Sequence, residues 1–384
     1  MKNQFAFLLH YPNLGSALEV LEQQRPLLQK AAKLLSRGSH DRLKETLLDL
    51  PPYRWFQFDE ILSASGKKVA GIAIICPFLP EQLVTFGEDR ILKKVFQGGR
   101  LAKRCGVKLI GLAGFCSIVG DEGLKLAKTF SMPVTSGNTY TAALAIQGIR
   151  RAAHLMGLKL ETATMAVIGA TGDIGSVCSR VFSKEVSELN LAARNEKRLE
   201  DFAQLLRNGH ACINVKKYIG EAIHNADIIL AATSSITTLI EAKDVKSGAI
   251  ICDVAIPHNV ATSIIRERPD VLAFEGGLAQ LPKPLKLSDQ RWLKWISPDG
   301  RTIFGCLAET VLLSLESRWE SFSISRGNIT PERVNEISKL ASRHGFSIAD
   351  FRYDGSVFTE RDIQRIRQYA KSRITSNHVE ATRN

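Results

Sequence analysis

The chain has 384 residues, of which 45% are hydrophobic and 23% are charged, and its formal net charge is +12. This composition excludes a low-complexity or fibrous chain, and the length favours two or three globular domains. The longest apolar run, VAGIAIICPFL at 69–79, is too short to cross a membrane, which takes about 20 residues. No signal peptide is expected, and seven cysteines without CxxC spacing predict a reducing, cytoplasmic compartment and no metal site.

In chain order, the pattern divides into three regions. Residues 1–160 mix predicted helices with short apolar strands such as KVAGIAIIC and GVKLIGLAGF, which favours an α/β N-terminal domain. Residues 161–280 alternate strands and helices at short intervals, which predicts βαβ units and a parallel sheet. Its predicted strands are TATMAVIGA, ELNLAAR, ACINV, ADIILAAT, GAIICDVAI and DVLAFEGG. Residues 281–384 are predicted to form a helical C-terminal region.

Part of the positive charge lies in one predicted helix of the first region, at Arg90, Lys93, Lys94, Arg100, Lys103 and Arg104. Such a face can attract an acidic protein or a phosphate-bearing ligand. The chain has no aromatic-basic RNA signature and no helix-turn-helix pattern, so nucleic acid is not an expected partner. A solvated basic face without any partner is the alternative.

A glycine-rich turn opens the second region, in the run MAVIGATGDIGSVCSRVF. A buried strand leads into this turn, and a helix with apolar periodicity follows it. The glycines permit a tight turn and a close backbone approach to a pyrophosphate, while the helix start offers N–H groups to the phosphates. We therefore predict a Rossmann-type dinucleotide-binding domain whose cofactor contacts include Gly169, Thr171, Gly172, Asp173, Ile174 and Gly175.

The residues after the second strand of this domain favour NADPH over NADH. An NAD-binding domain usually has an acidic residue there, whereas this chain has Arg194 and Asn195, with Arg198 one turn later. A guanidinium can pair with a 2′-phosphate, which a carboxylate would repel. Alternatively, Arg194 stacks on the adenine without selecting the phosphate. Thr233 and Ser234, after a later strand, are expected to line the cofactor.

Two helices are expected in the third region. RTIFGCLAETVLL at 301–313 predicts an amphipathic helix with Cys306 at its start. TPERVNEISKLASRHGF predicts a second helix, which Thr330 caps, Pro331 begins and Gly345 ends. A thiol at a helix start gains from the helix dipole, which lowers its pKa, so Cys306 is a candidate nucleophile. The alternative is a small buried residue, which is the role expected for Cys76, Cys178 and Cys252.

Seven motifs carry a resemblance that covers the chain from its opening to about residue 346. They are GLAGFCSIV (111–119), TSGNTYTAALAIQGI (135–149), IGATGDIGSVCSR (168–180), LAARNEKRLE (191–200), EGGL (275–278), FGCLAETVLLSLES (304–317) and GNIT (327–330). With these motifs the chain resembles the cyanobacterial-type long-chain acyl-[acyl-carrier-protein] reductases. The strand end CDVAIPHN differs from the glycine-rich form of that family, and Pro257 and His258 are expected to shape a loop there rather than to catalyse.

The resemblance implies NADPH-dependent reduction of a fatty acyl thioester to a fatty aldehyde through an acyl-cysteine on Cys306. Residues 1–160 would then hold the acyl substrate, and the basic helix at 90–104 would meet an acidic acyl-carrier protein, with acyl-CoA as the other donor. Peripheral contact with a membrane is compatible with this chemistry. Ser117, Gly137, Asn138 and Thr139 are expected either to donate hydrogen bonds to the thioester oxygen or nicotinamide amide, or to form a structural turn.

Two other functions stay open at this point. One is an NADP-dependent dehydrogenase of the shikimate or amino-acid type, which transfers a hydride directly and needs a Lys–Asp style acid/base pair. No convincing pair is evident in the chain. The other is a non-catalytic nucleotide-binding protein that has the fold without turnover.

Overall fold

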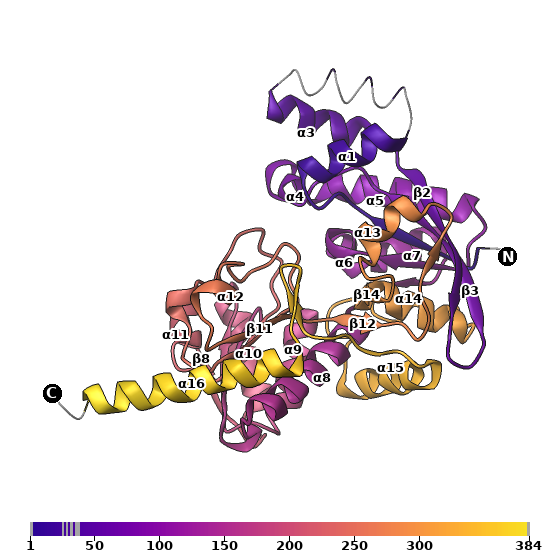
Figure 1. Ribbon diagram of the computed structural model, residues 1–384. Helices are drawn as coiled ribbons and strands as arrows, with labels where there is room; N and C mark the ends of the chain where they lie inside the picture. The colour runs from indigo at the N-terminus through magenta and orange to yellow at the C-terminus, as the bar shows by residue number, and fades with distance from the viewer. Residues whose placement is uncertain (1–2, 25–26, 28–29, 31–33, 35–38, 382–384) are drawn as a thin grey trace. The chain divides into compact units, whose positions relative to one another are not determined.

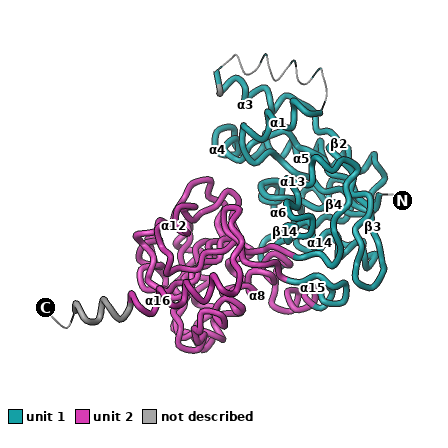
Figure 2. The backbone as a smooth tube through the Cα atoms, viewed as in Figure 1, with its two compact units in different colours: residues 1–138, 280–328, 339–347 teal, residues 139–279, 329–338, 348–384 magenta. Residues whose placement is uncertain are grey.

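The computed structural model describes residues 3–24, 27, 30, 34 and 39–381 (Figure 1). The chain forms two compact units, each assembled from separate stretches (Figure 2). Unit 1 comprises residues 1–138, 280–328 and 339–347, and unit 2 comprises residues 139–279, 329–338 and 348–384. These units divide the first expected range after residue 138 and share the residues beyond 280 between them.

Unit 1 is built on a six-stranded sheet with the order β13-β2-β3-β1-β4-β5. The central strand β1 pairs in parallel with β3 and β4, and β4 pairs in parallel with β5. β2 and β13 add an antiparallel edge. The strands are β1 (Phe5–Leu9), β2 (Tyr53–Leu62), β3 (Lys68–Ile75), β4 (Leu109–Leu112), β5 (Val134–Thr135) and β13 (Lys286–Leu287).

Helices cover both faces of this sheet. Successive side chains of β1 point to opposite faces: Leu8 lies beside Gly98 of α5 (Glu88–Arg104), whereas Phe7 lies on the side of α14 (Gly305–Leu315). The other helices in the described part of the unit are α1 (Leu14–Gln24), α3 (His40–Asp49), α4 (Glu81–Phe86), η1 (Gly114–Ser117), α6 (Val119–Glu122), α7 (Leu124–Phe130), η4 (Gln290–Trp292) and α13 (Leu293–Ile296). A short strand, β14 (Thr302–Phe304), precedes α14.

Unit 2 contains a six-stranded sheet in which every pair is parallel, with the order β11-β10-β9-β6-β7-β8. Numbered along the unit, this order is 6-5-4-1-2-3, which is the Rossmann arrangement. The strands are β6 (Thr164–Ile168), β7 (Glu188–Ala192), β8 (Cys212–Val215), β9 (Ile228–Ala231), β10 (Ile250–Asp253) and β11 (Leu272–Glu275). All six strands expected between 161 and 280 are present, so the predicted α/β fold is confirmed.

Helices and a C-terminal hairpin complete unit 2. The helices are η2 (Leu160–Thr162), α9 (Asp173–Phe182), α10 (Glu196–Leu206), α11 (Ile219–Ile223), η3 (Ala242–Asp244), α12 (Ile264–Glu267) and α16 (Glu360–Ala381). The hairpin consists of β16 (Arg352–Tyr353) and β17 (Ser356–Val357), and its Tyr353 belongs to the buried core beside β10 and β11. The chain passes between the units within α8 (Asn138–Met156), β12 (Leu278–Gln280), α15 (Pro331–His344) and β15 (Ser347–Ile348), and also between Asn328 and Ile329.

Three local expectations can be compared with this fold. The helix caps of α15 are confirmed, since Thr330 Oγ1 accepts from Arg333 N at 3.3 Å and Gly345 follows the last turn with φ +75°. The helix at Cys306 is present but is not amphipathic, because every residue of α14 except Cys306 is buried. Lys94 does not belong to the exposed basic face, because its Nζ donates to Leu50 O at 2.8 Å in the interior.

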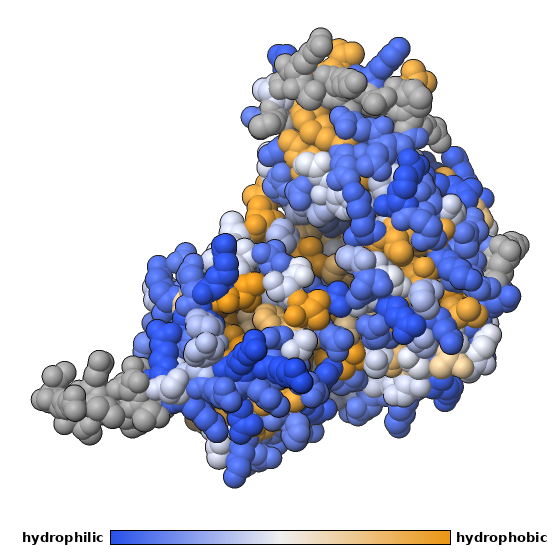
Figure 3. Space-filling view, viewed as in Figure 1, coloured by the Kyte–Doolittle hydropathy of each residue, from blue (hydrophilic) through white to orange (hydrophobic). Residues whose placement is uncertain are grey.

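The surface in view is mostly hydrophilic, with smaller apolar patches between the polar side chains (Figure 3). Within the described part of the chain, no helix combines the length and the hydropathy that a membrane span requires.

Candidate functional site

The glycine turn of unit 2 has the geometry of a phosphate-binding loop. β6 ends at Ile168, and α9 begins at Asp173 with Gly172 as its N-cap. Gly169 has φ +87°, and a Cβ there would lie 2.4 Å from Ala232 O. A Cβ on Gly175 would lie 2.3 Å from Gly169 O, so the helix can pack this closely only without a side chain. The residues present therefore fit a dinucleotide pyrophosphate at the start of α9, where Gly172 has no side chain to cover the first-turn N–H groups.

The structure brings the other predicted cofactor residues to the same edge of the unit 2 sheet. Arg194 Nη2 lies 3.4 Å from Ser234 Oγ and donates to it, so the ends of β7 and β9 meet there. Arg198 Nη2 donates to Thr171 O at 2.7 Å and so braces the glycine turn. The Asn195 side chain is the N-cap of α10 and accepts from Arg198 N at 2.9 Å.

Of these residues, Arg194 has its guanidinium at the exposed surface, while Arg198 is partly buried. Because it is exposed, Arg194 is the better placed of the two arginines for a 2′-phosphate. Asn195 has a structural contact instead, because its side chain caps α10. Ile174 lies in the first turn of α9 and is partly buried. Thr233 Oγ1 donates to Asn259 Oδ1 at 2.7 Å, and this contact connects the segment after β9 to the loop after β10.

Cys306 is the second residue of α14 in unit 1 and is partly exposed, with Phe304 as the N-cap residue before the helix. The neighbouring backbone N–H groups of Leu307, Cys306 and Gly114 act to lower the pKa of its thiol. Burial is the larger effect, however, and together with the nearby Glu309 charge it raises the pKa of the Cys306 thiol to about 12. The expected depression of the thiol pKa is therefore wrong as a net effect, because desolvation of the thiolate outweighs the helix-start donors.

The turn before α8 packs directly on this helix start. Gly137 has φ +77°, and a Cβ there would lie 2.1 Å from Cys306 Cα. Two residues that the sequence singled out separately are thus in backbone contact. Asn138 is partly exposed at the first position of α8 in unit 1, whereas Thr139 is buried and is the first residue of unit 2.

Ser117 takes the structural alternative that the sequence left open. Its Oγ donates to Gly114 O at 2.7 Å, within the short helix η1. The hydroxyl proton is used inside the turn, and the side chain is buried. Ser117 therefore fixes the backbone whose Gly114 N–H contacts Cys306.

Sequence reasoning missed His10, which also supports this turn. Its Nε2 accepts from Phe115 N at 3.0 Å, and its Nδ1 donates to Tyr11 O at 2.8 Å. Burial lowers the pKa of His10 to about 4, so the imidazole is neutral near pH 7. His10 follows β1 and is distant from the turn in sequence, and no local motif marks it.

Glu309 was missed as well. It lies one turn after Cys306 on α14 and is fully buried. Its carboxylate accepts from Ser323 Oγ at 2.6 Å and from Thr135 Oγ1. Ser323 N in turn donates to Thr135 Oγ1 at 3.2 Å. This network attaches the nucleophile helix to the strand that leads into Gly137, through residues that are far apart in the chain.

A separate polar cleft of about 620 Å³ lies in unit 2 beside Thr164 and Glu188, the first residues of β6 and β7. It is at the amino ends of these strands, whereas ligands of such sheets bind at the carboxyl ends. We therefore do not include it in the candidate site. Among the described residues, no cluster of three His, Cys, Asp or Glu side chains could hold a metal ion.

Comparison with known proteins gives one family match and several distant relatives. Residues 150–274 match the model of the Shikimate / quinate 5-dehydrogenase family. The chain is 26% identical over 378 residues to Aminotransferase PigE of Serratia sp., covering 97% of this chain and 43% of that protein. It is 29% identical over 296 residues to the Long-chain acyl-[acyl-carrier-protein] reductase of Synechococcus elongatus, covering 74% of this chain and 84% of that protein. The chain thus spans less than half the length of PigE.

A third relative is Glutamyl-tRNA reductase of Actinobacillus succinogenes, which is 26% identical over 192 residues and covers 47% of this chain and 44% of that protein. Among solved structures, L-tryptophan dehydrogenase from Nostoc punctiforme aligns with a TM-score of 0.34 at 14% identity, over 97% of this chain and 89% of that one. The sequence matches and the Rossmann topology of unit 2 support a family-level relation to dehydrogenases and reductases, an oxidoreductase function and a nicotinamide cofactor.

Proposed function

We propose that this protein is an NADPH-dependent reductase that converts a fatty acyl thioester to a fatty aldehyde through an acyl-enzyme on Cys306. The observation that carries the proposal is the environment of Cys306. Cys306 lies in the first turn of α14, and the Gly137 turn lies in van der Waals contact with its backbone. The neighbouring backbone N–H groups of Leu307, Cys306 and Gly114 act to lower the pKa of its thiol. The similarity to the Synechococcus acyl-[acyl-carrier-protein] reductase supports the substrate class.

The first step is a thioester exchange. The Cys306 sulfur attacks the carbonyl carbon of the donor, a new C–S bond forms, and the donor C–S bond breaks. Because the pKa of Cys306 is about 12, the thiol is protonated near pH 7, and its proton leaves with the departing donor thiol. One thioester replaces another, so the exchange has little thermodynamic cost.

The N–H groups around the sulfur have two uses in this step. They favour the thiolate as it forms, and we propose that those of Gly114 and Leu307 donate to the oxygen of the reacting carbonyl. Phe304 precedes the helix and is 38% exposed, so it offers an apolar surface next to Cys306 for an acyl chain. His10 and Ser117 hold the turn that supplies the Gly114 N–H.

Unit 2 would hold the cofactor through the α9 helix start, Thr233 and Ser234, with Arg194 available for the 2′-phosphate of NADPH. When bound, NADPH supplies the hydride that reduces the acyl group. Removal of the acyl group as an aldehyde restores the free Cys306 thiol, with one proton taken up from water.

We further propose that the acyl donor is carried by an acidic acyl-carrier protein that contacts α5. Arg90, Lys93, Arg100 and Arg104 are exposed on this helix at spacings of three, seven and four residues, which places them along one side. A stripe of four exposed cations attracts an acidic partner and raises its rate of association. Acyl-CoA, with its phosphates, is the alternative donor, and the same charge is compatible with peripheral membrane contact.

The experiment is a turnover assay of the purified full chain with acyl-carrier-protein and CoA thioesters. The proposal expects one NADPH oxidised for each aldehyde formed, and no aldehyde from the Cys306→Ser variant. A matched control is Cys212→Ser, which alters an exposed cysteine in unit 2. If Cys306→Ser retains full activity, the covalent mechanism is wrong.

The second candidate function is a dehydrogenase that transfers hydride directly. It is favoured by the match of residues 150–274 to the Shikimate / quinate 5-dehydrogenase family. That match lies wholly in unit 2 and leaves out the helix that carries Cys306. Dehydrogenase activity of Cys306→Ser with a hydroxy-acid or amino-acid substrate would favour this candidate. A non-catalytic nucleotide-binding protein would bind NADPH without oxidising it with any thioester.

A further inference from the structure

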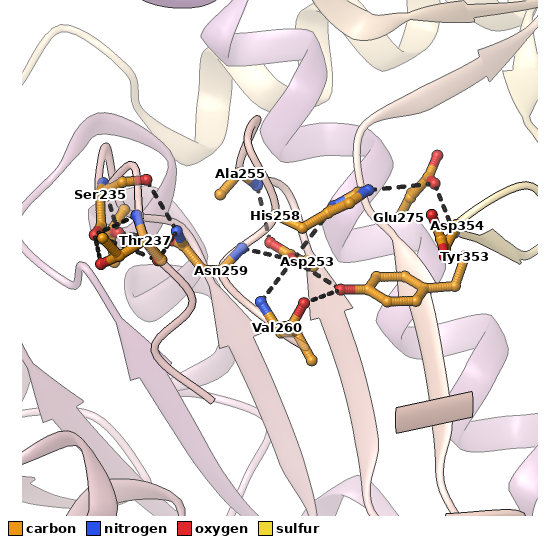
Figure 4. Close-up of polar contacts among 11 residues, drawn as sticks. Ser235, Thr237, Asp253, Ala255, His258, Asn259, Val260, Glu275, Tyr353 and Asp354 are labelled. Atoms are coloured by element: carbon orange, nitrogen blue, oxygen red, sulfur yellow. Dashed lines mark hydrogen bonds and ion pairs between the residues drawn. The ribbon is translucent and has the colours of Figure 1, made fainter. Parts of the chain in front are cut away.

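Two acidic side chains end neighbouring strands of unit 2. Asp253 is the last residue of β10 and Glu275 is the last residue of β11, and the two are paired in the register of the sheet. They therefore lie side by side at the carboxyl edge, on the half of a Rossmann sheet where the nicotinamide end of a dinucleotide binds. The chain returns over this edge through residues 254–260, which include His258 (Figure 4).

His258 lies between the two carboxylates. Its Nδ1 is 3.4 Å from Asp253 Oδ2, and its Nε2 is 3.6 Å from Glu275 Oε1. The Asp253 side chain is fully buried, whereas those of His258 and Glu275 are 27% and 20% exposed. Both contacts are ion-pair distances, and Nδ1 forms no hydrogen bond with the described residues. The attraction to the two carboxylates therefore depends on the positive charge of the imidazolium.

The C-terminal hairpin closes this cluster from the other side. The Tyr353 hydroxyl lies 3.2 Å from Asp253 Oδ2 and 2.8 Å from Val260 O, and its ring is in contact with His258 at a centroid distance of 5.0 Å. Asp354 N donates to Glu275 Oε1 at 3.2 Å. The chain beyond residue 350 lies outside the resemblance found in the sequence, yet its Tyr353 and Asp354 contact the carboxylates at this edge of the sheet.

The cluster is connected to the expected cofactor residues. Asp253 Oδ2 accepts from Asn259 N at 3.0 Å, and Asn259 Nδ2 donates to Ser235 O at 3.1 Å. Asn259 Oδ1 accepts from Thr233 Oγ1 at 2.7 Å. Fixing the loop at 254–260 therefore fixes Thr233 and the segment that carries Ser234, whose hydroxyl contacts Arg194.

The charges that face His258 favour its protonated form. Burial lowers the pKa of His258, but Asp253, Glu275 and Asp354 together outweigh it and raise the pKa above its ordinary value. Tyr353 adds no charge, because burial and the Asp253 carboxylate raise the pKa of its phenol. Burial also raises the pKa of Glu275, against the opposing effect of His258 and of Arg352.

We propose that protonated His258 is a positioning residue that bridges Asp253 and Glu275 and holds the loop at 254–260 in the shape that binds the dinucleotide, so that cofactor affinity falls when His258 loses its proton. The choice of NADPH as the cofactor rests on the proposed function. The bridge is present below the pKa of His258 in the folded protein and is lost as the pH rises through it.

The first test measures the NADPH dissociation constant of the full chain between pH 6 and pH 9. We expect affinity to weaken by about tenfold across this range in the wild type, which corresponds to about 1.4 kcal/mol. His258→Gln is expected to bind with the weak affinity of the wild type at high pH and to show no such pH dependence. His224→Gln, which alters an exposed histidine of the same unit, should keep the wild-type profile.

The second test needs no cofactor. The imidazole proton resonance of His258 should titrate above pH 6.5 in the wild type. In Glu275→Gln the titration midpoint should fall, because the substitution removes a negative charge that faces His258. The glutamine oxygen still offers an acceptor to Asp354 N. A Kd without pH dependence in the wild type, or a midpoint unchanged in Glu275→Gln, overturns the bridge. If NADPH fails to bind at every pH, both the proposed function and the coupling of the His258 bridge to the cofactor are wrong, even where the His258 resonance titrates as expected.

Discussion

Gly137→Ala tests whether the contact between the α8 turn and the Cys306 helix is required for folding and for chemistry. An alanine Cβ at this position would lie 2.1 Å from Cys306 Cα and 2.5 Å from Cys306 Cβ, whereas an ordinary contact is 3.4–4 Å. The turn or the helix start must therefore move by more than 1 Å. The backbone at Gly137 also has φ +77°, a conformation that alanine adopts at a cost.

The two costs can be separated with a matched glycine. A left-handed backbone costs a residue with a Cβ about 1–2 kcal/mol, and overpacking adds about 1–3 kcal/mol. Gly66 has φ +83° in the same unit, and a Cβ added there would meet none of the described residues within 4 Å, apart from its chain neighbours. Gly66→Ala should therefore lower the free energy of unfolding by about 1–2 kcal/mol, and Gly137→Ala by about 2–5 kcal/mol.

The assays are urea unfolding followed by tryptophan fluorescence, and the rate of acylation of Cys306 at a temperature where both variants are folded. A displacement of about 1 Å at a reacting group can cost about 100-fold in rate. We expect a loss of that order in Gly137→Ala and a rate close to wild type in Gly66→Ala. Equal unfolding energies and equal acylation rates for the two variants would refute the packing argument.

Three further predictions concern the Cys306 thiol, the Arg194 side chain and the exposed cations of α5. The rate of alkylation of Cys306 by iodoacetamide should keep rising with pH up to at least pH 10, because the pKa of this thiol is about 12. Glu309→Gln should raise the alkylation rate at pH 9 by about three- to tenfold, because the Glu309 charge raises the pKa of Cys306. Arg194→Ala should weaken NADPH binding by about tenfold and leave NADH binding little changed, as measured by cofactor fluorescence. Lys93→Glu combined with Arg100→Glu should slow association with an acyl-carrier protein by about tenfold at low salt, and the effect should shrink at high salt.

The predictions for Arg194 and for α5 each have a control elsewhere on the surface. Lys197→Ala removes an exposed cation three residues from Arg194 and should leave the preference for NADPH intact. Lys339→Glu changes the net charge on the exposed side of α15 and should leave carrier association near the wild-type rate. Equal effects of a variant and its control would contradict the role given to Arg194 or to α5.

The parts of the fold that could be predicted depend on short-range patterns. The strand before Gly169, the glycine turn and the helix after it are contiguous, and their residue types alone require that geometry. The caps at Thr330 and Gly345 are local in the same way. Parallel pairing of all six strands follows from the βαβ alternation, because each crossover helix returns the chain to the same edge.

The candidate site was only partly predictable, because its supporting contacts join residues that are far apart in the chain. Nothing near His10 indicates that it will accept from Phe115 N, and Glu309 reads as one polar residue on an apolar helix until Thr135 and Ser323 are placed beside it. The lowered pKa expected for Cys306 is wrong for a related reason, because the sequence indicates the helix start but not the degree of burial, which raises the pKa.

The most direct measurement of the central claim is the mass of the intact protein after incubation with an acyl thioester in the absence of NADPH. We expect the wild type to gain the mass of one acyl group less one hydrogen, and peptide mapping to place the acyl group on Cys306. Addition of NADPH should remove it with release of aldehyde. A wild-type protein without an adduct, or an adduct that persists in Cys306→Ala, would contradict the central claim.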